Sequence, residues 1–278
     1  MDVYIGFDSA WVDNPKAPGA ICAVGIEDDR SILFSAPETA SFAEALDFIR
    51  RVRSNSGVTL IALDQPTVVP NSTGMRPVER VAASLGSWLG GGVQPANRGK
   101  VGMFCDASPI WRFLTALGAE PAPERARIAT EGLYLMEVFP ALALASLDVG
   151  FFGRRKAPKY NPDNRKKFLI ADWVRVAEAA ARDARSLGCD NLAAWFEDSG
   201  KIPQPCKADQ DRLDAGLCTL IALHWRRRPR AASLMLGDTL FGYMVLPASR
   251  DVHGYMAVRG LKHARKHFVA IDGVVPTE

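Results

Sequence analysis

Apolar and polar residues follow strand-like patterns at the start of the chain. Three short segments are rich in apolar side chains and predict strands at residues 3–8, 20–26 and 31–35. Side chains alternate along the first segment, so that Phe7 and Asp8 lie on opposite faces of the predicted strand. A short polar connection joins the second and third segments as a hairpin. The pattern therefore predicts an antiparallel meander.

After the meander, the spacing of apolar residues first predicts a helix and then further strands. Ser41 is a predicted N-cap, and Glu44 completes a capping box ahead of an amphipathic helix. Residues 58–63 are continuously apolar, which is typical of a central strand covered on both faces. Residues 133–139 predict a further strand. This order predicts an α/β fold, with a mixed β-sheet flanked by helices.

The second half of the chain is mainly helical in pattern. A helical insert is expected at about residues 141–206, with a long helix at 164–187, and another long helix at 209–227. A basic C-terminal extension covers about residues 226–278 and is expected to be peripheral from His253 onward. Within it, two candidate strands lie at residues 240–246 and 268–271. The length suits a single domain over residues 1–278.

Composition changes this picture little. The 34 Lys and Arg against 31 Asp and Glu give a net charge of +3, which is too small a bias to indicate nucleic acid by itself. The five cysteines form no C-x-x-C pair, which argues against a disulfide framework or a zinc ribbon. No apolar run reaches the roughly 18 residues of a membrane span, and no signal peptide is visible. We expect a cytoplasmic protein with no membrane partner.

Carboxylates follow the predicted strands. Asp8, Asp64 and Glu137 each close an apolar run, and Asp214 lies near the start of the long helix at 209–227. A carboxylate at the end of a buried strand is costly unless a metal, another cation or water compensates it. The set suggests a shared site for hard cations such as Mg²⁺. Asp8 and Asp64 are also typical turn residues, so that alternative stays open.

Four short motifs in the chain resemble those of a known family. They are I-G-F-D-S-A-W at residues 5–11, L-D-Q-P at 63–66, E-V-F-P at 137–140 and K-A-D-Q-D-R-L-D-A at 207–215. Their order and spacing resemble the DUF429 family, whose members are described as predicted RNase H-like nucleases. The resemblance runs from about residue 3 to about residue 225. It implies an RNase H-like core within the mixed sheet and makes Asp8, Asp64, Glu137 and Asp214 the acidic set.

The expected activity is that of a divalent-metal-dependent nuclease or phosphodiesterase. Two Mg²⁺ or Mn²⁺ ions held by converging carboxylates activate water and stabilise the leaving oxygen. Asp214 is a better candidate ligand than Asp211, since it shares a helix face with apolar Cys218 and Ile221. Asp211 is a possible fifth ligand. Asp211 and Asp214 also fit a solvated stripe on the helix.

Five residues are candidates for binding the phosphate of a nucleic acid or nucleotide substrate: Lys156, Lys159, Tyr160, Lys207 and Arg80. Each has a plainer interpretation. The basic loop that carries the first three is also typical of a solvated charge run, and Lys207 has the i, i+4 spacing of a salt pair with Asp211. Arg76, Glu79 and Arg80 fit a surface helix turn as well as a phosphate site.

Other functions stay open. An actin-like or sugar-kinase-like nucleotide-binding phosphotransferase opens with a similar strand, but Asp8 is followed by no glycine-rich loop. A non-catalytic binding protein that retains the fold is a second alternative. A hydrolase of small nucleotides that uses the same metal site is a third, and sequence alone does not separate it from a nuclease.

Overall fold

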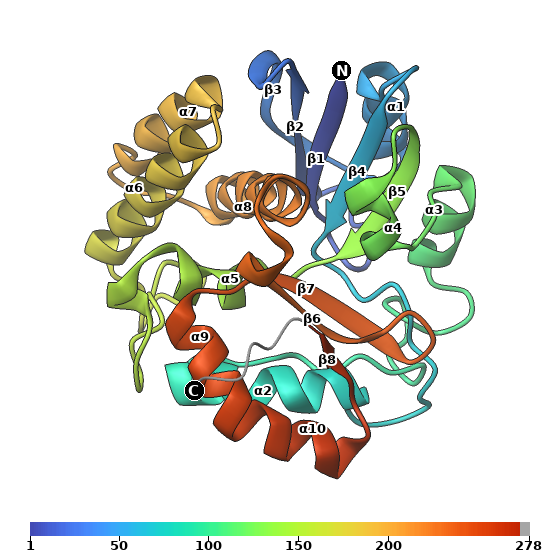
Figure 1. Cartoon of the computed structure of the whole chain (residues 1–278), viewed down its shortest axis with the longest axis vertical. Coiled ribbons are helices and arrows are strands. Elements are labelled where there is room, and N and C mark those ends of the chain that lie inside the picture. The colour runs from blue at the N-terminus through green and yellow to red at the C-terminus, as the bar shows by residue number, and fades with distance from the viewer. Residues whose placement is uncertain (273–278) are drawn as a thin grey trace.

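Five strands form the main sheet of the computed structural model, in the order β3-β2-β1-β4-β5 (Figure 1). The structure describes residues 1–272. The strands are β1 (Asp2–Asp8), β2 (Gly19–Glu27), β3 (Arg30–Ala40), β4 (Val58–Leu63) and β5 (Gly132–Glu137). β2 is antiparallel to β1 and to β3, whereas β4 is parallel to β1 and to β5. The predicted meander and mixed sheet are therefore confirmed.

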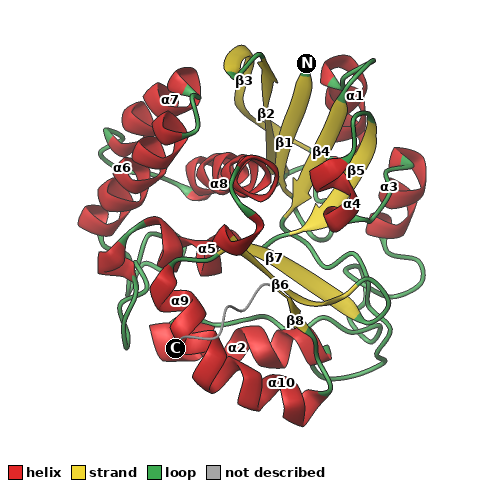
Figure 2. Ribbon diagram, viewed as in Figure 1, coloured by secondary structure: helices red, strands yellow, loops and turns green. Residues whose placement is uncertain are grey.

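Helices cover both faces of this sheet (Figure 2). The helices α1 (Phe42–Val52) and α3 (Pro109–Leu117) pack on the face that carries Ile5 and Phe7. The long helix α8 (Lys207–Arg227) packs on the other face, where Tyr4 joins its core. The predicted capping box is present at the start of α1. The apolar residues that alternate along β1 thus serve two separate cores.

The insert between β5 and α8 is helical, as predicted for residues 141–206. It contains α5 (Pro140–Leu147), α6 (Ile170–Ser186) and α7 (Asp190–Gly200). The expected helix at 164–187 begins later, because the Leu169 N–H donates to the carbonyl of Lys159 rather than to a helical partner. Gly188, at a φ of 75°, lets the chain turn from α6 into α7.

The C-terminal part forms a second sheet, in the order β7-β6-β8 (Figure 2). Its strands are β6 (Ser233–Asp238), β7 (Gly242–Pro247) and β8 (Ile271–Asp272). The predicted strand at 240–246 is therefore close to β7, which belongs to this second sheet and meets the main sheet through an isolated bridge between Val245 and Val138, the residue after β5. A separate apolar core unites this sheet with α2 (Pro77–Leu89), α9 (Arg250–Tyr255) and α10 (Leu261–His267). The expectation of a peripheral tail from His253 is wrong, since Met256 and Ala264 are buried in that core; residues 273–278 lie outside the described residues.

The remaining helical segments are short. They are α4 (Pro123–Ile128), two 3₁₀ turns at Val149–Phe151 and Arg230–Ala232, and a π-helical turn at Met256–Gly260. None of the helices within residues 1–272 is both long and apolar enough to cross a membrane.

Candidate functional site

A cavity of about 570 Å³ opens at the carboxyl ends of β1, β4 and β5. Its wall combines residues from both sheets, from the loop after β1 and from α8. Four of the predicted acids line it: Asp8, Asp64, Asp211 and Asp214. Glu137 also reaches the wall. The structure therefore brings the whole predicted acidic set to one cavity.

The pleat of the sheet aims two of these carboxylates at α8. Phe7 pairs with Leu63 across β1 and β4, and both side chains point into the core beneath α1 and α3. The residues that follow, Asp8 and Asp64, turn to the opposite face because side chains alternate along a strand. The ladder continues to this point, since the Asp64 N–H donates to the Phe7 carbonyl at 2.9 Å.

A glycine in β1 lets α8 come close enough to share this site. Gly6 faces α8, and a Cβ atom there would lie only 2.0 Å from the carbonyl oxygen of Ala215. Ala215 directly follows Asp214 on the helix. The close approach at Gly6 thus sets the position of the Asp214 carboxylate relative to Asp8.

Two side chains orient Asp214, which is only 5% exposed. The Tyr160 hydroxyl donates to its Oδ1 at 2.8 Å, and the Gln210 Nε2 donates to its Oδ2 at 2.8 Å. The other amide atom, Gln210 Oε1, is buried and has no hydrogen-bond partner among the described residues. A buried acceptor without a partner is costly, so the site is suited to a further donor or cation at this position.

Electrostatics make the cluster unfavourable as a group of charged acids. Burial and the neighbouring carboxylates of Asp64 and Asp214 raise the pKa of Asp8 well above its ordinary value. Burial and repulsion from Asp214 do the same to the pKa of Asp64. Burial raises the pKa of Asp214 to about 6, although the hydrogen bonds from Tyr160 and Gln210 act in the opposite direction. The three carboxyl groups therefore favour a bound proton or a bound cation over the free charged form.

Compensation from the protein itself is small. Lys207 is the one basic side chain among the described residues that line the cavity, and it forms an ion pair with Asp211. Although burial acts to lower it, Asp8 and Asp211 raise the pKa of Lys207. One half-exposed ammonium therefore faces the carboxylates of Asp8, Asp64 and Asp214 together with Asp211.

The donor chemistry fits a hard divalent cation. Carboxylate and amide oxygens are the ligands that Mg²⁺ and Mn²⁺ take in proteins. Asp8, Asp64 and Asp214 supply the carboxylates, and the buried Gln210 Oε1 lies beside them without a partner. Within residues 1–272, no three His, Cys, Asp or Glu side chains are already arranged as a metal site.

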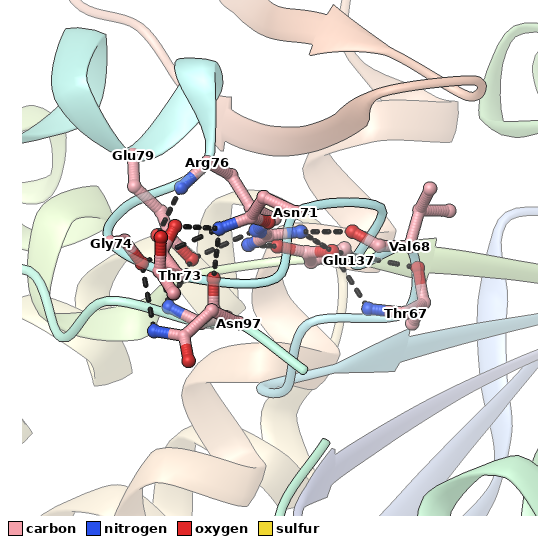
Figure 3. Close-up of polar contacts among 10 residues, drawn as sticks. Thr67, Val68, Asn71, Thr73, Gly74, Arg76, Glu79, Asn97 and Glu137 are labelled. Carbon is pink, nitrogen blue, oxygen red and sulfur yellow. Dashed lines mark hydrogen bonds and ion pairs between the residues drawn. The ribbon is translucent and has the colours of Figure 1, made fainter. Parts of the chain in front are cut away.

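Glu137 differs from the other strand-end acids, because a buried arginine neutralises it (Figure 3). Arg76 Nη2 lies 2.5 Å from Glu137 Oε1, and its Nη1 lies 3.0 Å from Oε2. The Thr67 N–H donates to the same Oε2 at 2.9 Å. Burial raises the pKa of Glu137, whereas the Arg76 ion pair opposes that rise. The predicted fourth ligand thus reaches the cavity wall with its carboxylate already paired.

Arg76 binds a second acid and forms what we call the Arg76 network, which consists of Arg76, Glu79 and Glu137 (Figure 3). Arg76 Nε donates to Glu79 Oε1 at 2.8 Å, and all three side chains are almost fully buried. The expectation of a surface turn or phosphate site at Arg76 and Glu79 is therefore wrong. The signal in the sequence was a capping-box spacing, since the Glu79 side chain accepts from the Arg76 N–H ahead of Pro77.

The predicted substrate-binding residues separate into two groups. Tyr160 and Lys207 line the cavity. Lys159 does not, because its ammonium donates to the Gly90 carbonyl at 2.7 Å. Lys156 and Arg80 are exposed and do not line the cavity. Gln210 and Trp11 are among the lining residues that were not predicted, and Trp11 carried a signal as the last letter of the I-G-F-D-S-A-W motif.

Comparison with protein-family models gives a match over residues 6–237 to a family described as "Protein of unknown function (DUF429)". No curated protein and no solved structure matches the chain. The matched segment includes every acid that lines the cavity.

Proposed function

The chain belongs to the DUF429 family, whose description gives no function, and from its site we propose that it is a divalent-cation-dependent phosphoesterase. The observation that carries the proposal is the convergence of Asp8, Asp64 and Asp214 on one cavity. These acids come from two parallel strand ends and one helix, and Lys207 is the single basic residue on the described wall.

The topology supports a finer assignment to the RNase H-like class. The strand order β3-β2-β1-β4-β5, with β2 alone antiparallel to its two neighbours, is compatible with the RNase H-like core that the family resemblance implies. Three members of the acidic set implied by the resemblance, at the ends of the first and fourth strands and on the long helix, line one cavity without a paired arginine among the described residues. These residues are Asp8, Asp64 and Asp214.

Each residue of the site has a proposed role. Divalent cations, when bound, neutralise phosphate charge and lower the pKa of water. Asp8, Asp64 and Asp214 supply oxygen ligands, and Tyr160 and Gln210 hold the Asp214 carboxylate by donating to both of its oxygens.

The ammonium of Lys207 binds a non-bridging phosphate oxygen. In the reaction, the oxygen of water forms a bond to phosphorus while the bond from phosphorus to the leaving alcohol oxygen breaks. A proton from the water ends on that alcohol.

Calorimetric titration with Mn²⁺ at pH 7.5 tests the proposal. We expect one or two ions to bind the wild type and Asp8→Asn to weaken binding at least tenfold. Asp47→Asn is the matched control, because Asp47 is exposed on α1 and pairs only with Arg50 in the described structure. Hydrolysis of bis(p-nitrophenyl) phosphate with Mg²⁺ or Mn²⁺ should follow the same order.

Two results would overturn this function. One is a wild-type protein that binds no Mn²⁺ or Mg²⁺ at millimolar concentration. The other is an Asp8→Asn variant that binds the ion and hydrolyses the diester as well as the Asp47→Asn control does.

A further inference from the structure

The shape of the cavity argues for a small substrate. Its volume of about 570 Å³ lies within the roughly 300–1,000 Å³ of small-molecule sites. Several segments build apolar walls around the acids, with Trp11 after β1, Val93 after α2, Phe139 after β5 and Met244 in β7. The carboxylates therefore lie in a pocket with apolar walls, which favours a ligand that carries an apolar group beside its phosphate.

The charge of the lining argues against a nucleic-acid strand. A strand carries one negative charge per nucleotide, and proteins that bind it follow the backbone with several basic groups. The described wall offers Lys207 alone, and Asp211 already pairs with that ammonium. Arg76 does not line the cavity, and Glu79 and Glu137 engage its guanidinium. The pocket is thus suited to a ligand with a single phosphate.

A fixed aromatic side chain lies beside the acids. The Trp11 Nε1–H donates to the Asp64 carbonyl at 3.2 Å, and its ring packs edge-to-face on Phe104 with centroids 5.3 Å apart. Aromatic faces held in this way bind the flat face of a nucleobase or another ring. Gln210, which donates to Asp214 through Nε2, has a buried Oε1 that is an acceptor without a described partner. Two different contacts are therefore available to the organic part of a ligand.

From these features we infer that the pocket takes a small ester of one phosphate with one aromatic or nucleobase-sized group. A nucleic-acid strand or duplex is excluded from it. The inference rests on the proposed function, since the phosphate is to be held through cations on Asp8, Asp64 and Asp214. The inference favours a hydrolase of small nucleotides over a nuclease, two alternatives that the sequence alone did not separate.

The test compares methyl p-nitrophenyl phosphate, a small diester with one aromatic group, with labelled 20-nucleotide single strands and duplexes, all with Mn²⁺. Ala141→Trp fills the pocket, because Ala141 lines it from the exposed side of α5. Ala194→Trp is the matched control on an exposed position of α7 that does not line the cavity. We expect Ala141→Trp to lower kcat/KM for the small diester at least tenfold, with unchanged Mn²⁺ affinity, and Ala194→Trp to have no effect.

The outcomes are distinguishable. Cleavage of the small diester that falls in Ala141→Trp, with kcat/KM at least tenfold above that of either oligonucleotide, supports the inference. Mn²⁺ binding with oligonucleotide cleavage as efficient as that of the small diester overturns it and leaves the proposed function intact. An unchanged kcat/KM in Ala141→Trp also overturns it. Absence of Mn²⁺ binding overturns the proposed function and, with it, this inference.

Discussion

Two groups of acids line one cavity, and they differ in what compensates them. In the Arg76 network, the carboxylates of Glu79 and Glu137 share a fully buried guanidinium. Around Asp214, the neighbouring acids have no such partner within the described residues, and the one lining cation is half-exposed Lys207. The acids of the Arg76 network are therefore neutralised by a buried cation, whereas the carboxylates of Asp8, Asp64 and Asp214 repel one another without one in the described structure.

The difference appears in the titration of the two groups. Although burial acts to lower it, Glu137 and Glu79 raise the pKa of Arg76 above its ordinary value, so the guanidinium stays charged. Burial raises the pKa of Glu137 too, but the Arg76 ion pair opposes that rise. Burial and mutual repulsion raise the pKa of Asp8, Asp64 and Asp214 without a described guanidinium to oppose the rise. Removal of a charge from the Arg76 network should therefore lower the free energy of unfolding of the protein. Removal of a charge from Asp8, Asp64 or Asp214 should raise it. The predictions below test this contrast, from the largest effect to the smallest.

Arg76→Met should have the largest effect. It leaves two buried carboxylates without their cation, and breaking a buried ion pair costs about 3–5 kcal/mol. We expect a loss of that size in the free energy of unfolding, measured by urea denaturation at pH 7.5. Arg80→Met, one turn along the same helix and exposed, should change it by no more than about 0.5 kcal/mol. A loss below about 1 kcal/mol in Arg76→Met would show that the network is not structural.

Glu137→Gln tests whether the paired carboxylate also serves as a metal ligand. It leaves Arg76 with one charged partner fewer, so we expect the free energy of unfolding to fall by about 3 kcal/mol. Mn²⁺ affinity should stay within about threefold of the wild type, as long as Glu137 acts only through the network. If affinity falls as far as in Asp8→Asn, Glu137 is a ligand, as the sequence pattern first indicated.

The different fates of Asp64 and Glu137 show what the sequence could and could not predict. Both residues close apolar strands, and the pattern placed them in one site. The register between β4 and β5 pairs Glu137 with Leu63 rather than with Asp64, so its side chain leaves the sheet on the other face. About seventy residues separate the two strands in the chain, and no local pattern fixes such a register.

Local signals predicted the main elements well. Alternation and capping identified β1 and α1, and the apolar runs identified β4 and β5. The second sheet was harder, because β8 is two residues long and its partners are distant in sequence. Arg76 was also unpredictable as a buried residue, since its partner Glu137 lies 61 positions away. In each case the missing information was a long-range contact.

Gly6→Ala should disturb the approach of α8 to the sheet. The added Cβ would lie 2.0 Å from the Ala215 carbonyl oxygen, so the helix has to move. Overpacking of this kind costs about 1–3 kcal/mol, and the shift should also weaken Mn²⁺ binding through Asp214. Gly254→Ala is the control, because a Cβ there meets nothing within 4 Å, and it should be neutral or slightly stabilising. Equal stability of the two variants would contradict this account of Gly6.

Asp214→Asn should have the smallest effect on stability and the opposite sign. The folded-state pKa of Asp214 is raised to about 6 from an ordinary value of 3.8. An acid of this kind stabilises the fold fully below the unfolded pKa and loses that contribution as pH rises through the folded value. In a chelator at pH 7.5, we expect the variant to be more stable than the wild type by about 1 kcal/mol. The difference should shrink between about pH 6 and pH 4.

The hydrogen bonds around Asp214 allow this substitution. The Tyr160 hydroxyl still donates to the amide oxygen, and a flip of the Gln210 amide turns its partnerless Oε1 toward the new amide N–H. Mn²⁺ should then reverse the order, because an ion that binds only the folded wild type raises its Tm while leaving the variant nearly unchanged. Thermal melts of the wild type and the variant at pH 4.5 and 7.5, with and without Mn²⁺, give the Tm of each protein under the four conditions. A variant less stable than the wild type at pH 7.5 in the chelator would place Asp214 with the acids of the Arg76 network, and the contrast between the two groups would fail.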